Sequence, residues 1–328
     1  MNQEYTIVIR TLGKAGEKYQ ALLDSINAQT IRPAQVLVFL PEGYALPPER
    51  LGNEKFVFCK KGMVSQRVAA FSQVQTTYTL ALDDDVSFEP IFVEELFRTM
   101  EKCDADFVSP IVRDIAPTNN APSRFKKMLF GMKEWLLGVS MRRNFKEDYL
   151  VKIWRTGGFL VKKNTKPNVQ YYNQSGHGTC IFGKTYALKK LHLEKELWLE
   201  DTRYALPDDM VTFYKLYLQG NVIAMNSEVK FYHLDAGSSM IDENRIQQTI
   251  YASARNGVIF WHRFIYKKMP NRLLSVLCLC RRLFFTSLFS LLKSIAKRNF
   301  IYFNSYMGGY VSAFRFIKSD AYKNLPRV

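Results

Sequence analysis

The stretch Tyr78-Thr79-Leu80-Ala81-Leu82-Asp83-Asp84-Asp85 joins an apolar run directly to three consecutive carboxylates. A short apolar run of this kind is typical of a buried strand. Three carboxylates at its end repel one another, and removing them from water is costly unless a positive group lies on them. Oxygen ligands suit Mg²⁺ or Mn²⁺, so the stretch indicates a divalent-cation site, with a solvated acidic turn as the alternative.

Apolar strands and amphipathic helices alternate on both sides of this stretch. The patterns predict strands at 5–10, 35–40, 55–59, 78–82 and 107–110, with helices at 19–26, 64–74 and 90–103 between them. This order predicts an α/β fold, with a mostly parallel sheet, right-handed crossovers and flanking helices. Carboxylates at the carboxyl end of a strand lie where open α/β sheets bind their ligands.

The composition fits a folded chain with a large core. The 328 residues are 47% hydrophobic and 14% aromatic, which excludes a disordered chain and allows one large domain or a domain with an appendage. The N-terminal residues show no signal-peptide pattern. The five cysteines are odd in number and scattered, so we expect a reduced, cytoplasmic protein.

The positive charge is concentrated in the C-terminal region. Residues 246–328 hold 14 Lys and Arg against one acid, Asp320, so this region carries +13 of the net charge of +16. It also holds the apolar runs 273–280 and 283–292, which Arg281 and Arg282 separate. The mixture favours a basic amphipathic helix lying on an anionic membrane. Helices packed on the catalytic domain and a nucleic-acid surface are the alternatives, the last disfavoured by the apolar character.

A second acidic pair precedes a helix further along the chain. Asp208 and Asp209 stand before an amphipathic segment that ends at Gly220. Such acids can cap a helix and interact with its dipole, so capping alone is one explanation. Two strand patterns, 222–225 and 228–232, then lead to His233. A histidine here is structural or, together with the carboxylates, part of a Mn²⁺ ligand set.

Four blocks in this order resemble glycosyltransferase family 2, the inverting GT-A enzymes that use nucleotide-diphosphate sugars. The blocks are residues 5–30 ending in Asn27-Ala28-Gln29-Thr30, Lys61 to Arg67, Leu82-Asp83-Asp84-Asp85, and Asp208-Asp209 through Gly220 to His233. Together they span roughly residues 5–235. Where the family has an acidic D-D-G-S that contacts the base, this chain has Leu40-Pro41-Glu42-Gly43, so Glu42 is the candidate substitute.

The resemblance implies a GT-A, Rossmann-like fold and a role for each site residue. Asp209 would be the catalytic base, and Asp85 with His233 would hold Mn²⁺ or Mg²⁺. His233 could instead contact the diphosphate, and His177 would line the acceptor side. The residues implied to bind the nucleotide sugar are Thr11, Glu42, Arg67, Asp83 and Asp84.

The predicted organisation is a catalytic domain over residues 1–240 and a C-terminal helical segment over 241–328. Within the first, residues 1–112 would bind the donor and 113–240 the acceptor. The implied function is metal-dependent transfer of a sugar to a hydroxyl acceptor, such as a saccharide or lipid-linked glycan in surface polysaccharide synthesis. The expected location is the inner face of the cell membrane, with no nucleic-acid partner. A sugar nucleotidyltransferase and a non-catalytic, membrane-peripheral nucleotide-sugar-binding protein are the alternatives.

Overall fold

The computed structural model describes residues 3–114, 124–166, 169–234 and 242–328. The chain forms two compact units: unit 1 holds residues 1–117, 168–197 and 208–236, and unit 2 holds 118–167, 198–207 and 237–328. The predicted boundary at 240–241 lies outside the described residues, and the one at 112–113 falls inside strand β6. The predicted domain boundaries therefore stay predictions.

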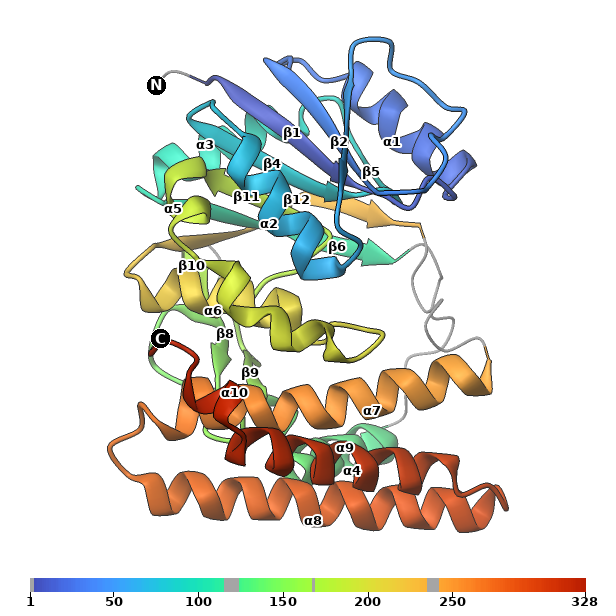
Figure 1. Ribbon diagram of the computed structural model, residues 1–328. Helices are drawn as coiled ribbons and strands as arrows, with labels where there is room; N and C mark the ends of the chain where they lie inside the picture. Colours follow the sequence, from blue (N-terminus) through green and yellow to red (C-terminus); the bar gives the residue numbers. More distant parts are fainter. Residues whose placement is uncertain (1–2, 115–123, 167–168, 235–241) are drawn as a thin grey trace. The chain divides into compact units, whose positions relative to one another are not determined.

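Unit 1 is built on one sheet, whose strands are labelled in Figure 1. Its strand order is β3-β2-β1-β4-β11-β6-β12-β10, and β5 pairs with β12. The strands are β1 (Tyr5–Arg10), β2 (Gln35–Pro41), β3 (Lys55–Cys59), β4 (Tyr78–Asp83), β5 (Val86–Phe88), β6 (Phe107–Asp114), β10 (Tyr171–Asn173), β11 (Cys180–Lys184) and β12 (Ile223–His233).

The sheet is mostly parallel. Strands β3, β2, β1 and β4 run parallel, β6 and β12 are parallel to each other, and β11 lies antiparallel between β4 and β6. The predicted α/β fold with a mostly parallel sheet flanked by helices is confirmed. Because β1, β2 and β4 run in the same direction, their carboxyl ends meet at one sheet edge, and the acidic stretch begins there.

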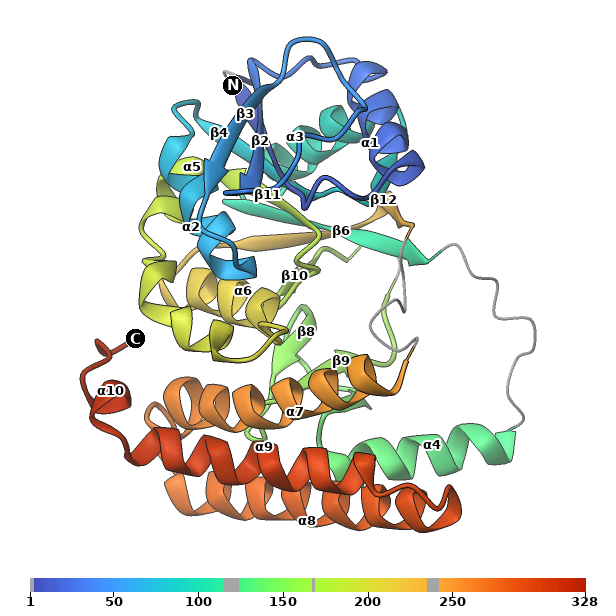
Figure 2. The ribbon, with the colours of Figure 1, turned by 45° about the vertical axis from the view of Figure 1, so that its right-hand side comes forward.

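Helices cover both faces of this sheet (Figures 1 and 2). Buried residues of α1 (Glu17–Asn27) and α3 (Phe92–Lys102) pack in one cluster with alternate residues of β1, β2 and β4. This alternation is the period expected of a strand buried on two sides. Helix α2 (Met63–Gln73) packs on β1 and β2, and α5 (Thr185–Lys189) and α6 (Asp208–Leu218) complete unit 1. A 3₁₀ segment, Leu193–Asp201, follows α5.

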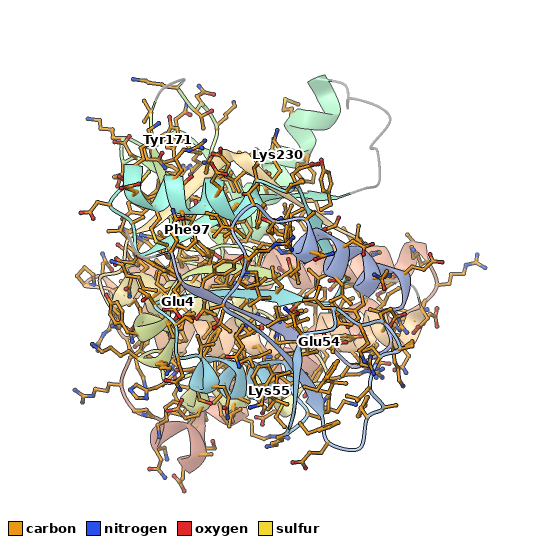
Figure 3. All side chains as sticks on the ribbon, turned by 90° about the horizontal axis from the view of Figure 1, so that it is seen from above. Glu4, Glu54, Lys55, Phe97, Tyr171 and Lys230 are labelled. Carbon is orange, nitrogen blue, oxygen red and sulfur yellow. The ribbon has the colours of Figure 1, made fainter. Side chains whose placement is uncertain are left out.

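Phe97 on α3 occupies the centre of the cluster and is labelled in Figure 3. Its ring centroid lies 5.0 Å from that of Phe182, 5.1 Å from Tyr78 and 6.0 Å from Tyr5, all in edge-to-face geometry. Aromatic pairs at these distances add to the free energy gained by burying their area. One helix residue thus joins three strands of the sheet.

One strand prediction differs from the structure. The expected strand pair 222–225 and 228–232 is one strand, β12, whose register with β6 shifts between Asn226 and Lys230. Between β6 and β12, β9 (Phe159–Lys162) pairs with β8 (Tyr149–Ile153), and β10 pairs with β12. Gly157, with a φ of 75°, makes the turn between β8 and β9.

Unit 2 combines three short strands with long helices. Strand β9 pairs with β7 (Ser140–Arg143) as well as with β8. The helices are α4 (Arg124–Leu137), α7 (Glu243–Phe260) with a π-helical continuation (Trp261–Tyr266), α8 (Arg272–Ala296), α9 (Ile301–Lys318) and α10 (Asp320–Lys323). The predicted C-terminal helices are therefore present, and the two apolar runs form one helix, α8.

Replacing Phe97 by Ala should lower the free energy of unfolding of unit 1 by about 3–5 kcal/mol, because the cavity left between three strands cannot collapse. Urea denaturation followed by circular dichroism measures this. Ile91 is 51% exposed, so Ile91→Ala is the matched control and should change stability by less than about 0.5 kcal/mol. Equal losses in both variants would contradict the assignment of Phe97 to the core.

Candidate active site

Asp83 ends β4 beside an arginine on the neighbouring strand. The parallel register places Asp83 opposite Arg10, the last residue of β1. Arg10 donates to Asp83 Oδ1 from Nε at 3.0 Å and from a terminal nitrogen at 2.5 Å. Burial alone would lower the pKa of Arg10, but Asp83 and Asp208 raise it above its usual value. The first carboxylate of the triplet is therefore neutralised by the protein itself.

Asp84 is held by a hydroxyl rather than by a cation. Thr11, which is 4% exposed, donates from its side-chain oxygen to Asp84 Oδ2 at 2.5 Å, and it accepts from the Gly13 backbone N–H at 2.8 Å. Burial raises the pKa of Asp84 to about 6; the Thr11 bond opposes this, and the neighbours Asp83 and Asp85 add to it. Asp84 therefore retains an uncompensated charge when it ionises.

Asp85 presents a buried oxygen without a protein partner. Its Oδ2 lies 3.2 Å from Nε2 of His233, while its Oδ1 is buried and has no hydrogen-bond partner among the described residues. The pairing of β5 with β12, in which Val86 faces His233, brings the two side chains together. A buried carboxylate oxygen left unpaired is costly, so Asp85 Oδ1 is available to accept a positive ligand.

The two residues of the second acidic pair, Asp208 and Asp209, have different contacts. Asp208 is 6% exposed, and its Oδ2 accepts from Arg67 at 2.5 Å and lies 3.9 Å from Arg10. Arg67 is 2% exposed and also donates to the Gly178 carbonyl at 3.0 Å. Burial and the neighbouring Arg10 lower the pKa of Arg67, although Asp208 opposes this shift. These contacts make Arg67 a positioning residue, and its predicted role in nucleotide binding stays a prediction.

Asp209 is partly exposed and carries no ion pair among the described residues. Its Oδ1 accepts from the backbone N–H of Met210 at 2.7 Å, at the start of α6. Burial and then Asp208 raise the pKa of Asp209 to about 6, against the opposing effects of the Met210 bond and Arg67. Asp209 is thus a carboxyl group that titrates just below neutral pH and can accept a proton.

Two chains of contacts join the acidic stretch to the second pair. In the first, Arg10 binds Asp83 and approaches Asp208. In the second, His233 beside Asp85 lies 5.7 Å, ring to ring, from His177, whose neighbour Gly178 touches Asp209. A Cβ at position 178 would stand 2.7 Å from the Asp209 Cβ, so glycine permits this approach. The two acidic patches therefore belong to one continuous site in unit 1.

Glu42 lies apart from this network. It is exposed just after β2, where its backbone N–H donates to the Cys59 carbonyl at 2.9 Å. Strand β2 neighbours β1, so Glu42 stands on the same sheet edge as the acidic stretch. Of the predicted site residues, Thr11, Arg67, Asp83, Asp84, Asp85, Asp209 and His233 are linked by contacts, and His177 joins them. Their individual roles stay predictions.

Arg10 and Gly178 were not predicted as site residues, and Asp208 was predicted only as a member of the acidic pair. Arg10 and Asp83 each end an apolar strand, but the sequence does not show that these two strands are neighbours. Parallel neighbours of similar length align their last residues, so a cation on one strand end meets an acid on the other. For Gly178, no pattern in the sequence predicts its contact with Asp209.

The model of the family described as Glycosyl transferase family 2 matches residues 56–178. The predicted resemblance to that family is confirmed. The matched segment contains Arg67, the Asp83–Asp85 stretch and His177, and it ends before Asp209 and His233. This glycosyltransferase segment supports transfer of a sugar as the activity, while donor and acceptor are not identified by the match.

Among solved structures, the crystal structure of S. aureus TarS 1-349 is similar to this chain. The two share 14% sequence identity, with a TM-score of 0.49 and coverage of 94% of this chain and 80% of that one. At these values the likeness carries no argument about activity. No curated protein matches the chain.

Replacing Asp209 by Asn should stabilise unit 1 at neutral pH. The unfolded carboxyl titrates near pH 4 and the folded one near 6, so ionisation of Asp209 costs about 1–3 kcal/mol of stability above pH 6 and nothing below 4. The substituted amide would retain the bond from the Met210 N–H without the charge. Urea denaturation at pH 7.5 and at pH 4 tests this. A variant less stable than the parent at pH 7.5 would show that the ionised carboxylate is favoured.

Proposed function

We propose that this protein is a metal-dependent, inverting glycosyltransferase that moves a sugar from a nucleotide-diphosphate donor to a hydroxyl acceptor. The observation that carries the proposal is the division of the acidic groups within one site. Asp85 offers an unpaired, buried oxygen beside His233, while Asp209, whose pKa is raised to about 6, is kept free of ion pairs among the described residues. The family match over residues 56–178 supports the transferase class.

Asp85 and His233 fit the protein's share of a divalent-cation site. Within the described ranges, no group of three His, Cys, Asp or Glu side chains is placed to hold a metal ion by itself. Mg²⁺ is commonly bound through one or two carboxylates together with substrate phosphates, so a two-residue protein share suits a site completed by a diphosphate. When bound, Mn²⁺ or Mg²⁺ would neutralise charge on the leaving diphosphate.

Asp209 is the proposed general base. A carboxyl with a pKa near 6 is ionised at neutral pH and remains basic enough to accept a proton from an aligned hydroxyl. As the acceptor oxygen bonds to the anomeric carbon, its proton moves to Asp209. The bond from that carbon to the diphosphate breaks, and its electron pair leaves with the diphosphate. A single displacement of this kind inverts the anomeric configuration. Asp208 is unsuited to this step because Arg67 holds it.

The remaining residues would bind and orient the donor. Thr11 orients Asp84, and Arg10 orients Asp83, so these two carboxylates are fixed before a nucleotide arrives. Glu42 is exposed on the same sheet edge and is available to contact a base or ribose. His177, between His233 and the Asp209 side of the site, is the proposed residue facing the acceptor.

We further propose that the protein works at the inner face of the cell membrane on a saccharide or lipid-linked acceptor in surface polysaccharide synthesis. Support comes from α8, whose length and composition would allow a membrane span and whose 18-residue apolar window is only 22% buried. The basic charge of residues 246–328 would favour an anionic leaflet. Large apolar residues of α4, including Met128, Phe130 and Trp135, are exposed as well.

Replacing Asp209 by Asn should reduce the rate of sugar transfer by about 10²–10⁴-fold while leaving donor binding almost unchanged, because the base acts only in the transition state. In the parent, kcat/KM should rise with pH through about 6 as Asp209 loses its proton. Product formation from a panel of nucleotide sugars measures the rate. The exposed Glu101→Gln is the charge-matched control. Near-normal turnover of Asp209→Asn would refute this base.

Replacing Asp85 by Ala should weaken binding of nucleoside diphosphates about tenfold or more when Mn²⁺ is present, and little when a chelator is present. Calorimetric titration under both conditions separates metal-linked binding from nucleotide contacts. Glu101→Gln again serves as the control. Equal weakening with and without Mn²⁺ would mean that Asp85 contacts the nucleotide directly and holds no cation.

A further inference from the structure

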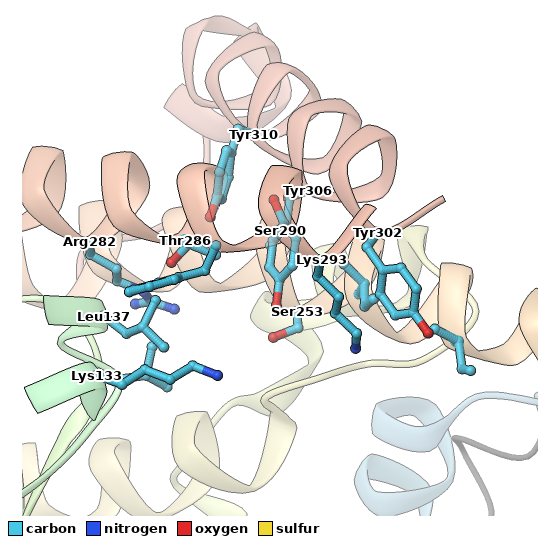
Figure 4. Close-up of a pocket in the computed structure, with 15 residues that line it drawn as sticks. Lys133, Leu137, Ser253, Arg282, Thr286, Ser290, Lys293, Tyr302, Tyr306 and Tyr310 are labelled. Atoms are coloured by element: carbon cyan, nitrogen blue, oxygen red, sulfur yellow. The ribbon is translucent and has the colours of Figure 1, made fainter. Parts of the chain in front are cut away.

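Unit 2 contains a cavity of about 520 Å³ that the proposed reaction does not use. Residues of α4, α7, α8 and α9 line it, and Figure 4 shows their side chains around the open space. The lining residues that the argument uses are Lys133, Arg282, Thr286, Phe289, Ser290 and Lys293. The volume lies within the range of small-molecule sites and exceeds what a single ion needs.

The charge of this cavity is positive and lacks a protein counter-ion. Lys133 projects from α4, and Arg282 and Lys293 project from α8, while no lining residue is acidic. In the described part of the chain none of these cations forms an ion pair; Arg282 instead donates to the Thr156 carbonyl at 2.8 Å. Burial lowers the pKa of Arg282, against a smaller opposing effect of Tyr310. Cations gathered in this way favour an anionic ligand.

The rest of the lining suits a ligand with both a polar and an apolar end. Hydroxyl groups come from Thr286, Ser290 and the tyrosines of α9, and apolar walls come from Leu137 and Phe289. Nζ of Lys293 lies 3.8 Å from the Tyr302 ring centroid, and Nζ of Lys133 lies 5.8 Å from that of Phe289. Both ammonium groups thus stand at the junction of polar and apolar surface.

Helix α8 presents this cavity on one face and an apolar stripe on the other. Arg282, Thr286, Ser290 and Lys293 share a face at intervals of three and four residues. At 3.6 residues per turn, the exposed apolar residues fall on roughly the opposite side of the helix. These residues are Leu273, Leu277, Phe284, Leu288, Leu292 and Ile295, from 37% to 71% exposed. An uncharged stripe of this size suits contact with lipid.

We propose that this cavity binds the phosphate headgroup and first carbons of an anionic lipid. Lys133, Arg282 and Lys293 neutralise the phosphate, the hydroxyl of Thr286 donates to one of its oxygens, and the apolar walls cover the adjoining carbons. The apolar stripe of α8 holds the protein on the membrane from which the lipid comes. The inference rests on the proposed membrane association and is independent of sugar transfer.

The test is binding of the full chain, without nucleotide sugar or metal, to vesicles of phosphatidylcholine with or without phosphatidic acid. Lys133→Gln with Lys293→Gln removes two cavity charges. Lys297→Gln with Lys318→Gln removes two exposed charges outside it. Each basic residue near an anionic surface contributes about a factor of five, so both pairs should lose this part of the binding. The cavity pair should lose at least about fivefold more, because its two charges contact the lipid phosphate directly.

A variant that leaves the net charge unchanged distinguishes lipid binding in the cavity from electrostatic attraction to the protein surface. Ser253 lines the cavity and is exposed, so Ser253→Trp should fill the space and weaken binding without changing the charge. Circular dichroism and melting temperature must match those of the parent. Binding that follows total charge alone, with Ser253→Trp indistinguishable from the parent, would overturn the proposal.

Calorimetry with soluble compounds separates a lipid from a free phosphate. A short-chain phosphatidic acid should bind more tightly than glycerol 3-phosphate, and the cavity variants should lose this difference. Equal binding of the two compounds, or binding of neither, would overturn the lipid assignment. Asp209→Asn should bind both vesicles and soluble lipid like the parent. A chain that binds lipid but transfers no sugar would refute the proposed function while leaving this inference standing.

Discussion

Two largely buried arginines decide which acids of the site remain available for chemistry. Arg10 holds Asp83 and approaches Asp208, and Arg67 holds Asp208 within a region that is closed to water. In such surroundings an ion pair is maintained only when both partners stay together, and removing one partner typically costs about 3–5 kcal/mol. The arginines therefore neutralise two of the five clustered carboxylates and leave Asp84, Asp85 and Asp209 uncompensated. Burial, without a bound arginine to offset it, raises the pKa values of Asp84 and Asp209.

The sequence predicts most strands of the fold and the acidic residues of the site, but it predicts neither the strand directions nor the role of Arg10. The apolar runs located β1, β2, β3 and β4, because two-sided burial leaves a continuous apolar signal. Strand direction does not show in such a run, so the antiparallel β11 and the register shift in β12 could not be predicted. Likewise, the acidic residues located the site in the sequence. The role of Arg10 became clear only from the strand register, which places Arg10 opposite Asp83.

The composition of α8 predicted its amphipathic character but did not show how its two faces are used. Arg281 and Arg282 interrupt the apolar runs in sequence, yet the helix continues through them because its two faces differ. Arg281 lies over the Trp135 ring at 4.7 Å, and Arg282 turns into the cavity. The apolar residues occupy the opposite face and stay exposed. The sequence predicted an amphipathic basic helix, whereas the cavity on one face of that helix is seen only in the structure.

The acidic pair at the start of α6 shows which electrostatic effect dominates at the site. A helix N-terminus stabilises a carboxylate by about 0.3–1 kcal/mol, which would lower the pKa of Asp209 by less than one unit. The pKa is instead raised to about 6, so burial and the adjacent Asp208 outweigh both the dipole and the Met210 bond. Helix capping, the simpler explanation of the pair, accounts for the position of Asp209 but not for the direction of this shift. A residue selected for capping alone would gain by being exposed and ionised. The half-buried Asp209, with Gly178 against it, therefore lowers the stability of the fold when it ionises, as expected of a residue held for the proposed proton transfer.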